Sequence, residues 1–192
     1  MSVFNYFSQI ITGYQSKKRT IGGIQVHYKF SGKAILFDPI EMLRNLRFKI
    51  SESENSSLNL SQSIKNIDDV LLKRNELQKA TVIASFMFEE RKVKVVRYVK
   101  TVGNMPISRY DFFLDSNLFS VFQRQYDYGK GFTSVLQKME PYGSKPQTQN
   151  DNSYYWADAN SERAVLLEKF GHTQIWLIYD SNCLKDVWKN FP

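Results

Sequence analysis

The sequence predicts an α+β fold in which helices pack on one face of an antiparallel sheet or sheets. Several segments alternate apolar and polar residues with a period of two, which is typical of half-buried strands. Neighbouring segments of this kind are joined by short polar turns, which favours antiparallel pairing. Segments with helical spacing lie between groups of strands and do not follow every strand. The chain has 192 residues, of which 42% are hydrophobic, so it is long enough to bury a core.

The first clear strand lies at residues 24–30, where apolar side chains occupy every second position. A Ser-Gly pair then turns the chain into residues 33–37, which we expect to be the second arm of a hairpin. Asp38 is suited to cap a helix and Pro39 to occupy its first position, because proline lacks the N–H that is unpaired there in any case. A short helix through about residue 46 is therefore predicted.

The middle of the chain contains a polar break followed by two strands. Residues 51–63 are rich in serine, asparagine and glutamate, which predicts a loop, and helical spacing resumes between residues 64 and 77. Residues 80–88 and 92–100 have strand patterns and are separated by the polar triplet at 89–91. We expect these two strands to pair in antiparallel fashion.

The second half repeats this arrangement, and we treat residues 1–192 as one domain. An alternative division near residues 105–115 would give two small α+β halves. Helical spacing is found at residues 116–126, 132–139 and 184–191, and strand patterns are found at residues 154–156, 163–170 and 173–179.

The N-terminal segment has helical spacing between Phe4 and Tyr14 and carries no charge before Lys17. Its apolar run is interrupted by polar residues, so we expect no cleaved signal peptide. Lys17, Lys18 and Arg19 follow, and an apolar helix face beside cations can lie on a membrane surface. We favour a helix that packs on its own sheet, because interfacial helices carry their cations along the polar face.

The composition excludes several kinds of site. Two histidines and one cysteine are too few for a zinc cluster built from Cys and His alone, and we expect no cofactor. One cysteine also excludes an internal disulfide, which favours a cytoplasmic location. Cys183 lies near a predicted helix start, where a thiol pKa can fall, with His172 as a candidate base. A buried structural cysteine is the preferred interpretation.

Two further patterns suggest phosphate or metal chemistry. The segment 128–132 contains two glycines and a lysine but lacks the spacing of a phosphate-binding loop, so a turn between helices is favoured. Glu90-x-Lys92 with Asp69, or with Asp68, upstream resembles the acid and Glu-x-Lys pattern of restriction-type nucleases. This resemblance implies a bound metal ion. Against it, Glu90 falls in a predicted hairpin turn.

The densest basic segment is the predicted strand 92–100, in a chain with a net charge of +7. Alternation places Lys92, Lys94, Tyr98 and Lys100 on one face, with Arg97 beside them. Cations and an aromatic ring suit phosphates and stacked bases, but edge strands also carry lysine to prevent unwanted pairing. Aromatic residues near the C-terminus suit either recognition or a core.

We therefore expect a non-enzymatic binding protein that recognises another protein through an aromatic and basic surface. The predicted site consists of Lys92, Lys94, Arg97, Tyr98 and Lys100. The alternative is a nucleic-acid-binding protein, or a metal-dependent nuclease that uses Asp69, Glu90 and Lys92. Membrane contact through the N-terminal helix is the third alternative.

Overall fold

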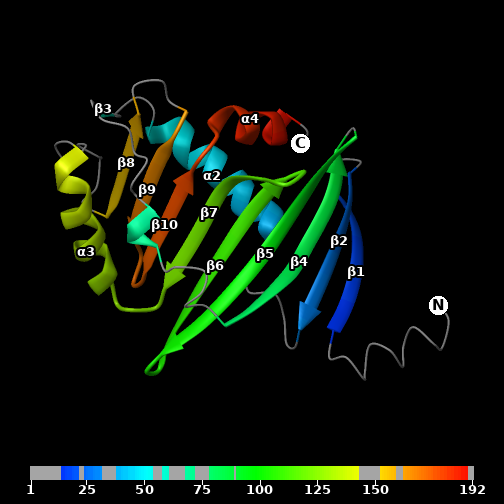
Figure 1. The fold of residues 1–192 in the computed structure, drawn as a ribbon, viewed down its shortest axis with the longest axis horizontal. Helices are drawn as coiled ribbons and strands as arrows, with labels where there is room; N and C mark the ends of the chain where they lie inside the picture. Colours follow the sequence, from blue (N-terminus) through cyan, green and yellow to red (C-terminus); the bar gives the residue numbers. More distant parts are fainter. Residues whose placement is uncertain are drawn as a thin grey trace.

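The computed structural model describes residues 14–21, 24–31, 38–53, 58–60, 68–71, 78–88, 90–142, 152–158 and 162–189, and these form one twisted sheet with helices on it (Figure 1). The α+β class is confirmed. The strands are β1 (Tyr14–Ile21), β2 (Ile24–Ser31), β3 (Leu58–Leu60), β4 (Gln78–Phe88), β5 (Arg91–Val102), β6 (Met105–Leu114), β7 (Asn117–Gln125), β8 (Ser153–Asp158), β9 (Ala164–Lys169) and β10 (Thr173–Ile178). The helices are α2 (Pro39–Ser53), α3 (Lys130–Met139) and α4 (Ser181–Lys189), with 3-10 turns at residues 68–70 and η4 (Glu140–Tyr142).

The sheet has ten strands in the order β1-β2-β4-β5-β6-β7-β10-β9-β8-β3. All neighbours pair in antiparallel fashion except β3 and β8, which are parallel. Strands β4 to β7 follow one another along the chain and in space, joined by short turns. Residues 105–114 form β6 in the middle of the sheet, and β7 pairs with β10, so strands from both halves of the chain belong to one sheet.

Helices α2 and α4 cover one face of the sheet, which we call the α2 face. Trp176 of β10 belongs to the buried cluster that contains Leu43 of α2 and Trp188 of α4. The next residue of β10, Leu177, belongs to a second cluster with Phe132 of α3. Successive strand residues point to opposite sides, so α3 lies on the other face, which we call the α3 face. The expected one-sided packing therefore applies to α2 and α4, while α3 covers the β9–β10 end from the opposite side.

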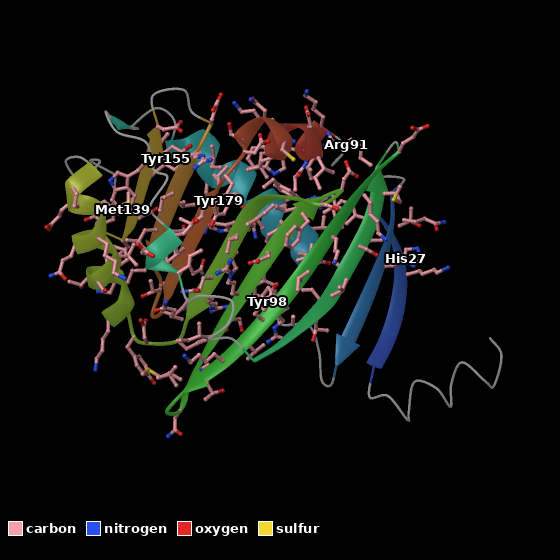
Figure 2. The ribbon with its side chains drawn as sticks, in the orientation of Figure 1. His27, Arg91, Tyr98, Met139, Tyr155 and Tyr179 are labelled. Carbon is pink, nitrogen blue, oxygen red and sulfur yellow. The ribbon has the colours of Figure 1, made fainter. Side chains whose placement is uncertain are left out.

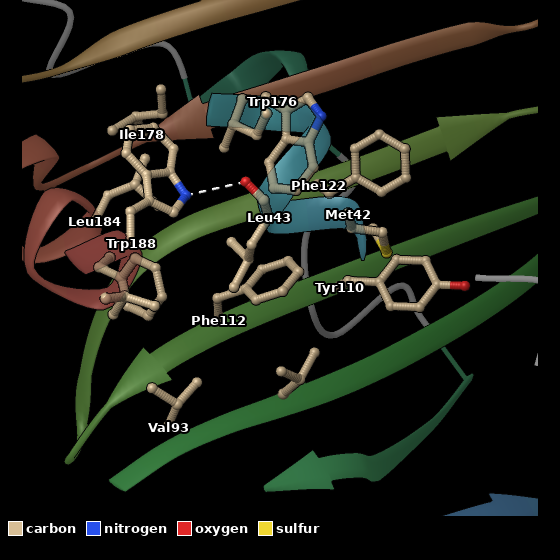
Figure 3. Packing of buried hydrophobic residues seen from close by; sticks show 14 of the residues in the cluster. Met42, Leu43, Val93, Tyr110, Phe112, Phe122, Trp176, Ile178, Leu184 and Trp188 are labelled. Atoms are coloured by element: carbon tan, nitrogen blue, oxygen red, sulfur yellow. Dashed lines mark hydrogen bonds between the residues drawn. The ribbon is translucent and has the colours of Figure 1, made fainter. Parts of the chain in front are cut away.

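The core of the α2 face is aromatic (Figure 3). The rings of Phe112 and Phe122 lie 5.6 Å and 4.7 Å from the Trp176 ring, measured between centroids. Trp188 donates its indole N–H to the carbonyl oxygen of Leu43 at 2.9 Å. This hydrogen bond joins α4 to α2 above the sheet.

Helices α2 and α4 each begin at an aspartate whose carboxylate accepts a backbone N–H of the first turn. The Ile40 N–H donates to the Asp38 carboxylate at 2.9 Å, as predicted for an N-terminal cap. At α4 the Cys183 N–H donates to the Asp180 carboxylate at 2.8 Å, so Asp180 caps this helix. Helix α2 also continues to Ser53, into the segment predicted as a loop.

The prediction of a helix at residues 116–126 is wrong, because residues 117–125 form β7. Pairing between β6 and β7 shifts by one residue at Phe119, where β7 carries a bulge. The bulge places Phe119 and Phe122 in the same cluster at a helix-like spacing of three, while Val121 belongs to the other cluster. Strand β6 was not predicted at all.

The N-terminal predictions are partly outside the described residues. The predictions for residues 1–13 and 33–37 lie outside the described residues, whereas Tyr14 begins strand β1. Lys17, Lys18 and Arg19 therefore lie within an edge strand, and β1 is the hairpin partner of β2. Of the predicted helical segment 64–77, the structure describes only the turn at 68–71. No described helix is long and apolar enough to cross a membrane.

Candidate functional site

The predicted basic surface lies on the α3 face, at the end of the sheet away from α3. Lys92 and Lys94 are exposed, and Tyr98 and Lys100 on the same side of β5 are half-buried. The register extends this row across the sheet, because Lys94 pairs with Ser85, Ser85 with His27, and His27 with Lys18. Figure 2 labels Tyr98 and His27 on these strands. We call the set Lys18, His27, Lys92, Lys94, Tyr98 and Lys100 the lysine face.

The strands that carry the lysine face contain no acidic residue. The sequences of β1, β2, β4 and β5 include neither aspartate nor glutamate. Cations on these strands therefore have no carboxylate neighbour within their own strands. A surface with one sign of charge attracts partners of the opposite sign over a distance of about one Debye length, ~8 Å at physiological salt.

Apolar side chains are exposed among these lysines. Met87, which pairs with Lys92, is 49% exposed, and Val82, which pairs with Val96, is 37% exposed. The aromatic residues near the C-terminus do not add to this surface. Tyr155, Trp156, Trp176 and Trp188 are buried, Tyr154 and Tyr179 are half-buried, and Phe191 lies outside the described residues. Among the described side chains, the aromatic member of the lysine face is Tyr98, which is half-buried.

Arg97 points to the opposite side of β5, onto the α2 face. Its guanidinium carbon lies 5.9 Å from the ring centre of Tyr110, which is its cross-strand partner on β6. Arg124 of β7 lies on the same face, where its guanidinium carbon is 4.5 Å from the Tyr126 ring. Together with His172 these residues form a group that we call the arginine cluster: Arg97, Tyr110, Arg124, Tyr126 and His172.

Sequence reasoning did not predict the arginine cluster. Its members come from β5, β6, β7 and the β9–β10 turn, and the order of strands in the sheet brings them together. The ring of Tyr126 stacks on His172 with centroids 5.5 Å apart. Arg124 Nη2 lies 3.3 Å from His172 Nδ1, and Gln174 Nε2 lies 2.6 Å from His172 Nε2.

The hydrogen bonds of His172 determine its tautomer. A guanidinium group can only donate, so Nδ1 must accept from Arg124 and the ring proton must sit on Nε2. Nε2–H then requires an acceptor, which the carboxamide of Gln174 provides when its oxygen faces the ring. Burial, followed by the nearby Arg124 charge, lowers the pKa of His172 below its usual 6.5.

The pKa values of Arg124 and Tyr110 are both shifted by burial, and the charges of the cluster oppose these shifts. Burial lowers the pKa of Arg124, and Tyr126 and Tyr110 oppose this effect. Burial raises the pKa of Tyr110, and Arg97 and Arg124 both oppose the rise. Both guanidinium groups therefore act on the same phenol, which remains protonated at neutral pH and can donate a hydrogen bond.

The glycine-lysine segment follows strand β7 and begins α3, so the predicted turn between two helices is wrong. Gly129 has a left-handed backbone with φ of 80°. The carboxylate of Asp127 accepts from the Gly129 N–H at 3.1 Å, the Gly131 N–H at 2.6 Å and the Thr173 hydroxyl at 3.0 Å. A Cβ at Gly131 would collide with this carboxylate. The helix start is thus occupied by an internal anion, which leaves no room for phosphate.

Cys183 and His172 lie at opposite ends of β10, which spans about 17 Å. Burial raises the pKa of the Cys183 thiol to about 11, with Asp180 adding to the rise. Cys183 packs against the core of the α2 face. The structure therefore does not bring these two residues together, and the thiol is the structural one that the sequence favoured.

The residues of the nuclease pattern are also separated. Glu90 is in the β4–β5 turn, whereas Asp69 lies in the 68–70 turn, where its carbonyl oxygen accepts from Lys138 of α3 at 3.1 Å. Strands β5, β6 and β7 lie between these two turns (Figure 1). Across the described part of the chain, no group of three or more His, Cys, Asp or Glu side chains is arranged to hold a metal ion.

Comparisons with protein-family models, with curated proteins and with solved structures gave no match for this chain.

Proposed function

We propose that this protein is a binding protein whose lysine face recognises an acidic surface of another protein. The observation that carries the proposal is the absence of aspartate and glutamate from β1, β2, β4 and β5, together with the exposure of Lys92 and Lys94. Strands that carry cations and no carboxylate suit a partner with the opposite sign of charge.

The exposed apolar residues favour a protein partner over nucleic acid. An exposed ion pair contributes only about 0.2–1 kcal/mol, so lysines alone give weak association. Met87 and Val82 add apolar area between the cations, and this combination of apolar centre and charged rim is typical of protein interfaces. Single-strand binding surfaces use several stacking aromatics, whereas the lysine face has one half-buried tyrosine, Tyr98.

Parallel affinity capture from an extract of the source cells tests the proposal. The baits are the natural protein, the variant Lys92→Glu/Lys94→Glu, and the control Lys130→Glu/Lys185→Glu, which changes two exposed lysines on α3 and α4 by the same charge. Each bait is tested in extract with nuclease treatment and, in parallel, without it. We expect an acidic protein to be retained by the natural protein and the control and lost with the lysine-face variant.

Two results would count against the proposal. If all three baits retain the same proteins, the lysine face is not the binding surface. If retention depends on omitting the nuclease, nucleic acid is the ligand, and the affinity should then fall steeply with salt as counterions are released from phosphates.

A further inference from the structure

The arginine cluster lies on the α2 face, on the opposite side of the sheet from the lysine face. Arg97 on β5 and Arg124 on β7 flank β6, two strand spacings or about 10 Å apart across the sheet and two residues or about 7 Å apart along it. Both guanidinium groups nevertheless lie close enough to Tyr110 of β6 to act on its phenol. Ser108 pairs with Arg124, and Tyr110 pairs with Arg97.

Two carboxylates of the described residues lie near this cluster, and both are already engaged. Glu168 is 3% exposed and forms an ion pair with Lys49 of α2. Asp127 accepts two backbone N–H groups and the Thr173 hydroxyl. Neither carboxylate is placed to balance Arg97, whose Nε atom is buried without a hydrogen-bond partner. A buried donor of a charged group without an acceptor is costly, and an oxyanion would supply that acceptor.

We propose that the arginine cluster binds a phosphate-type oxyanion between Arg97 and Arg124, above Ser108 and Tyr110. A guanidinium group matches the spacing of two oxygens on one phosphate, and two such groups match the double charge of a phosphomonoester. The phenol of Tyr110 stays protonated and donates a further hydrogen bond. The stacked rings of Tyr126 and His172 beside Arg124 provide an aromatic wall for the group that carries the phosphate.

His172 couples anion binding to pH. In the absence of an anion its Nδ1 accepts from Arg124, and a proton there would face that cation. Among the described residues, the other charged groups that act on the ring are Asp127 and, on α2, Lys49, while Tyr126 and Gln174 are its neutral neighbours. An anion bound at Arg124 offsets the repulsion, so it favours protonated His172. Binding is therefore expected to tighten as the pH falls below 6.5.

Sulfate is a suitable probe because its charge stays constant over the relevant pH range. Calorimetric titration of the full chain with sulfate, at ionic strength held constant with chloride, should show saturable binding. Arg97→Gln should weaken it by about tenfold or more, because one charge-assisted contact is lost. Lys94→Gln on the opposite face of the same strand should leave it unchanged. No saturable binding, or equal loss in both variants, would overturn the proposal.

Arg97→Lys serves as a second variant if Arg97→Gln does not fold, because it keeps the charge and loses the paired donors. It should weaken sulfate binding while leaving the unfolding transition cooperative. Phenyl phosphate and acetate separate the ligand classes. Tighter binding of phenyl phosphate than of inorganic phosphate supports a monoester beside the aromatic wall, whereas acetate binding as tightly as phosphate would overturn the assignment to a dianion.

The pH dependence is measured by the same sulfate titration, with the variant His172→Gln and the control His27→Gln. The natural protein and the His27 variant should bind sulfate more tightly at about pH 5.5 than at about pH 7.5, and the His172 variant should not. A pH dependence that survives in His172→Gln would contradict the coupling. Because Lys92→Glu/Lys94→Glu should bind sulfate normally, failure of this inference and failure of the proposed function are distinguishable.

Discussion

Trp188 of α4 and Leu43 of α2 are joined by a buried hydrogen bond from the indole Nε1 to the backbone carbonyl oxygen, 2.9 Å long. The two residues are far apart in the sequence, and their contact fixes one helix against the other on the α2 face. Trp156 provides a comparison within the same protein. It is 1% exposed, yet its indole N–H has no hydrogen-bond partner.

We therefore expect Trp188→Phe to destabilise the protein more than Trp156→Phe. The first change removes a buried hydrogen bond, which adds about 0.5–1.5 kcal/mol to the packing loss. The second removes a donor that had no acceptor, so its cost is limited to the lost packing. Urea unfolding of both variants measures the difference. Equal free energies of unfolding would contradict the role assigned to the hydrogen bond.

Arg109 and Asp111 form a buried ion pair on the α3 face of β6, with Nε and Oδ1 separated by 2.6 Å. Removing one partner takes away the ion pair of a buried charge, so Arg109→Met and Asp111→Leu should each cost about 3–5 kcal/mol. The double variant should cost much less than the sum of the two. A double-mutant cycle measures this coupling, and the exposed pair Lys189–Asp186 serves as the control in which no measurable coupling is expected. Additive single effects at Arg109 and Asp111 would contradict this assignment.

The Cys183 thiol should react slowly with iodoacetamide in the folded protein. Burial raises its pKa to about 11 from an ordinary 9.0, so the thiolate fraction at about pH 8 falls roughly a hundredfold. The reaction rate of the folded chain, compared with that of the chain in denaturant, measures this protection. If the folded and the denatured chain react with iodoacetamide at the same rate, the thiol is not buried and its pKa is not raised.

His172 should make the protein less stable as the pH falls. Burial and Arg124 lower its pKa in the folded state below 6.5, so the unfolded chain takes up the proton at higher pH than the folded chain. The free energy of unfolding should therefore decrease from pH 6.5 downwards until the folded-state pKa is passed. His172→Gln should remove this component, whereas His27→Gln should retain it. Denaturant titrations from about pH 7.5 to about pH 5 in low-sulfate buffer provide the measurement.

Predictability from the sequence depended on whether a strand is buried on one face or on both. Strand β5 was predicted because Val93 and Val95 are buried while Lys92 and Lys94 are exposed, which preserves the alternation. Strands β6 and β7 are buried along most of their length, so no alternation remains. The bulge at Phe119 then gives β7 the spacing of a helix.

The same reasoning explains which surface was predicted. The β5 residues of the lysine face lie on one strand, so a period of two was sufficient to group Lys92, Lys94, Tyr98 and Lys100. Lys18 and His27 joined them only through the pairing of β1, β2 and β4. The contact between Arg124 and His172 spans 48 residues and depends on β7 pairing with β10, which no local pattern reveals.

The most direct test of the lysine face is quantitative capture from nuclease-treated extract with Lys92→Glu/Lys94→Glu, alongside the natural protein and Lys130→Glu/Lys185→Glu. We predict that the same acidic protein is recovered with the natural bait and the helix control, and that the lysine-face variant loses it while remaining folded. Recovery of that protein in equal amount with all three baits would contradict the account.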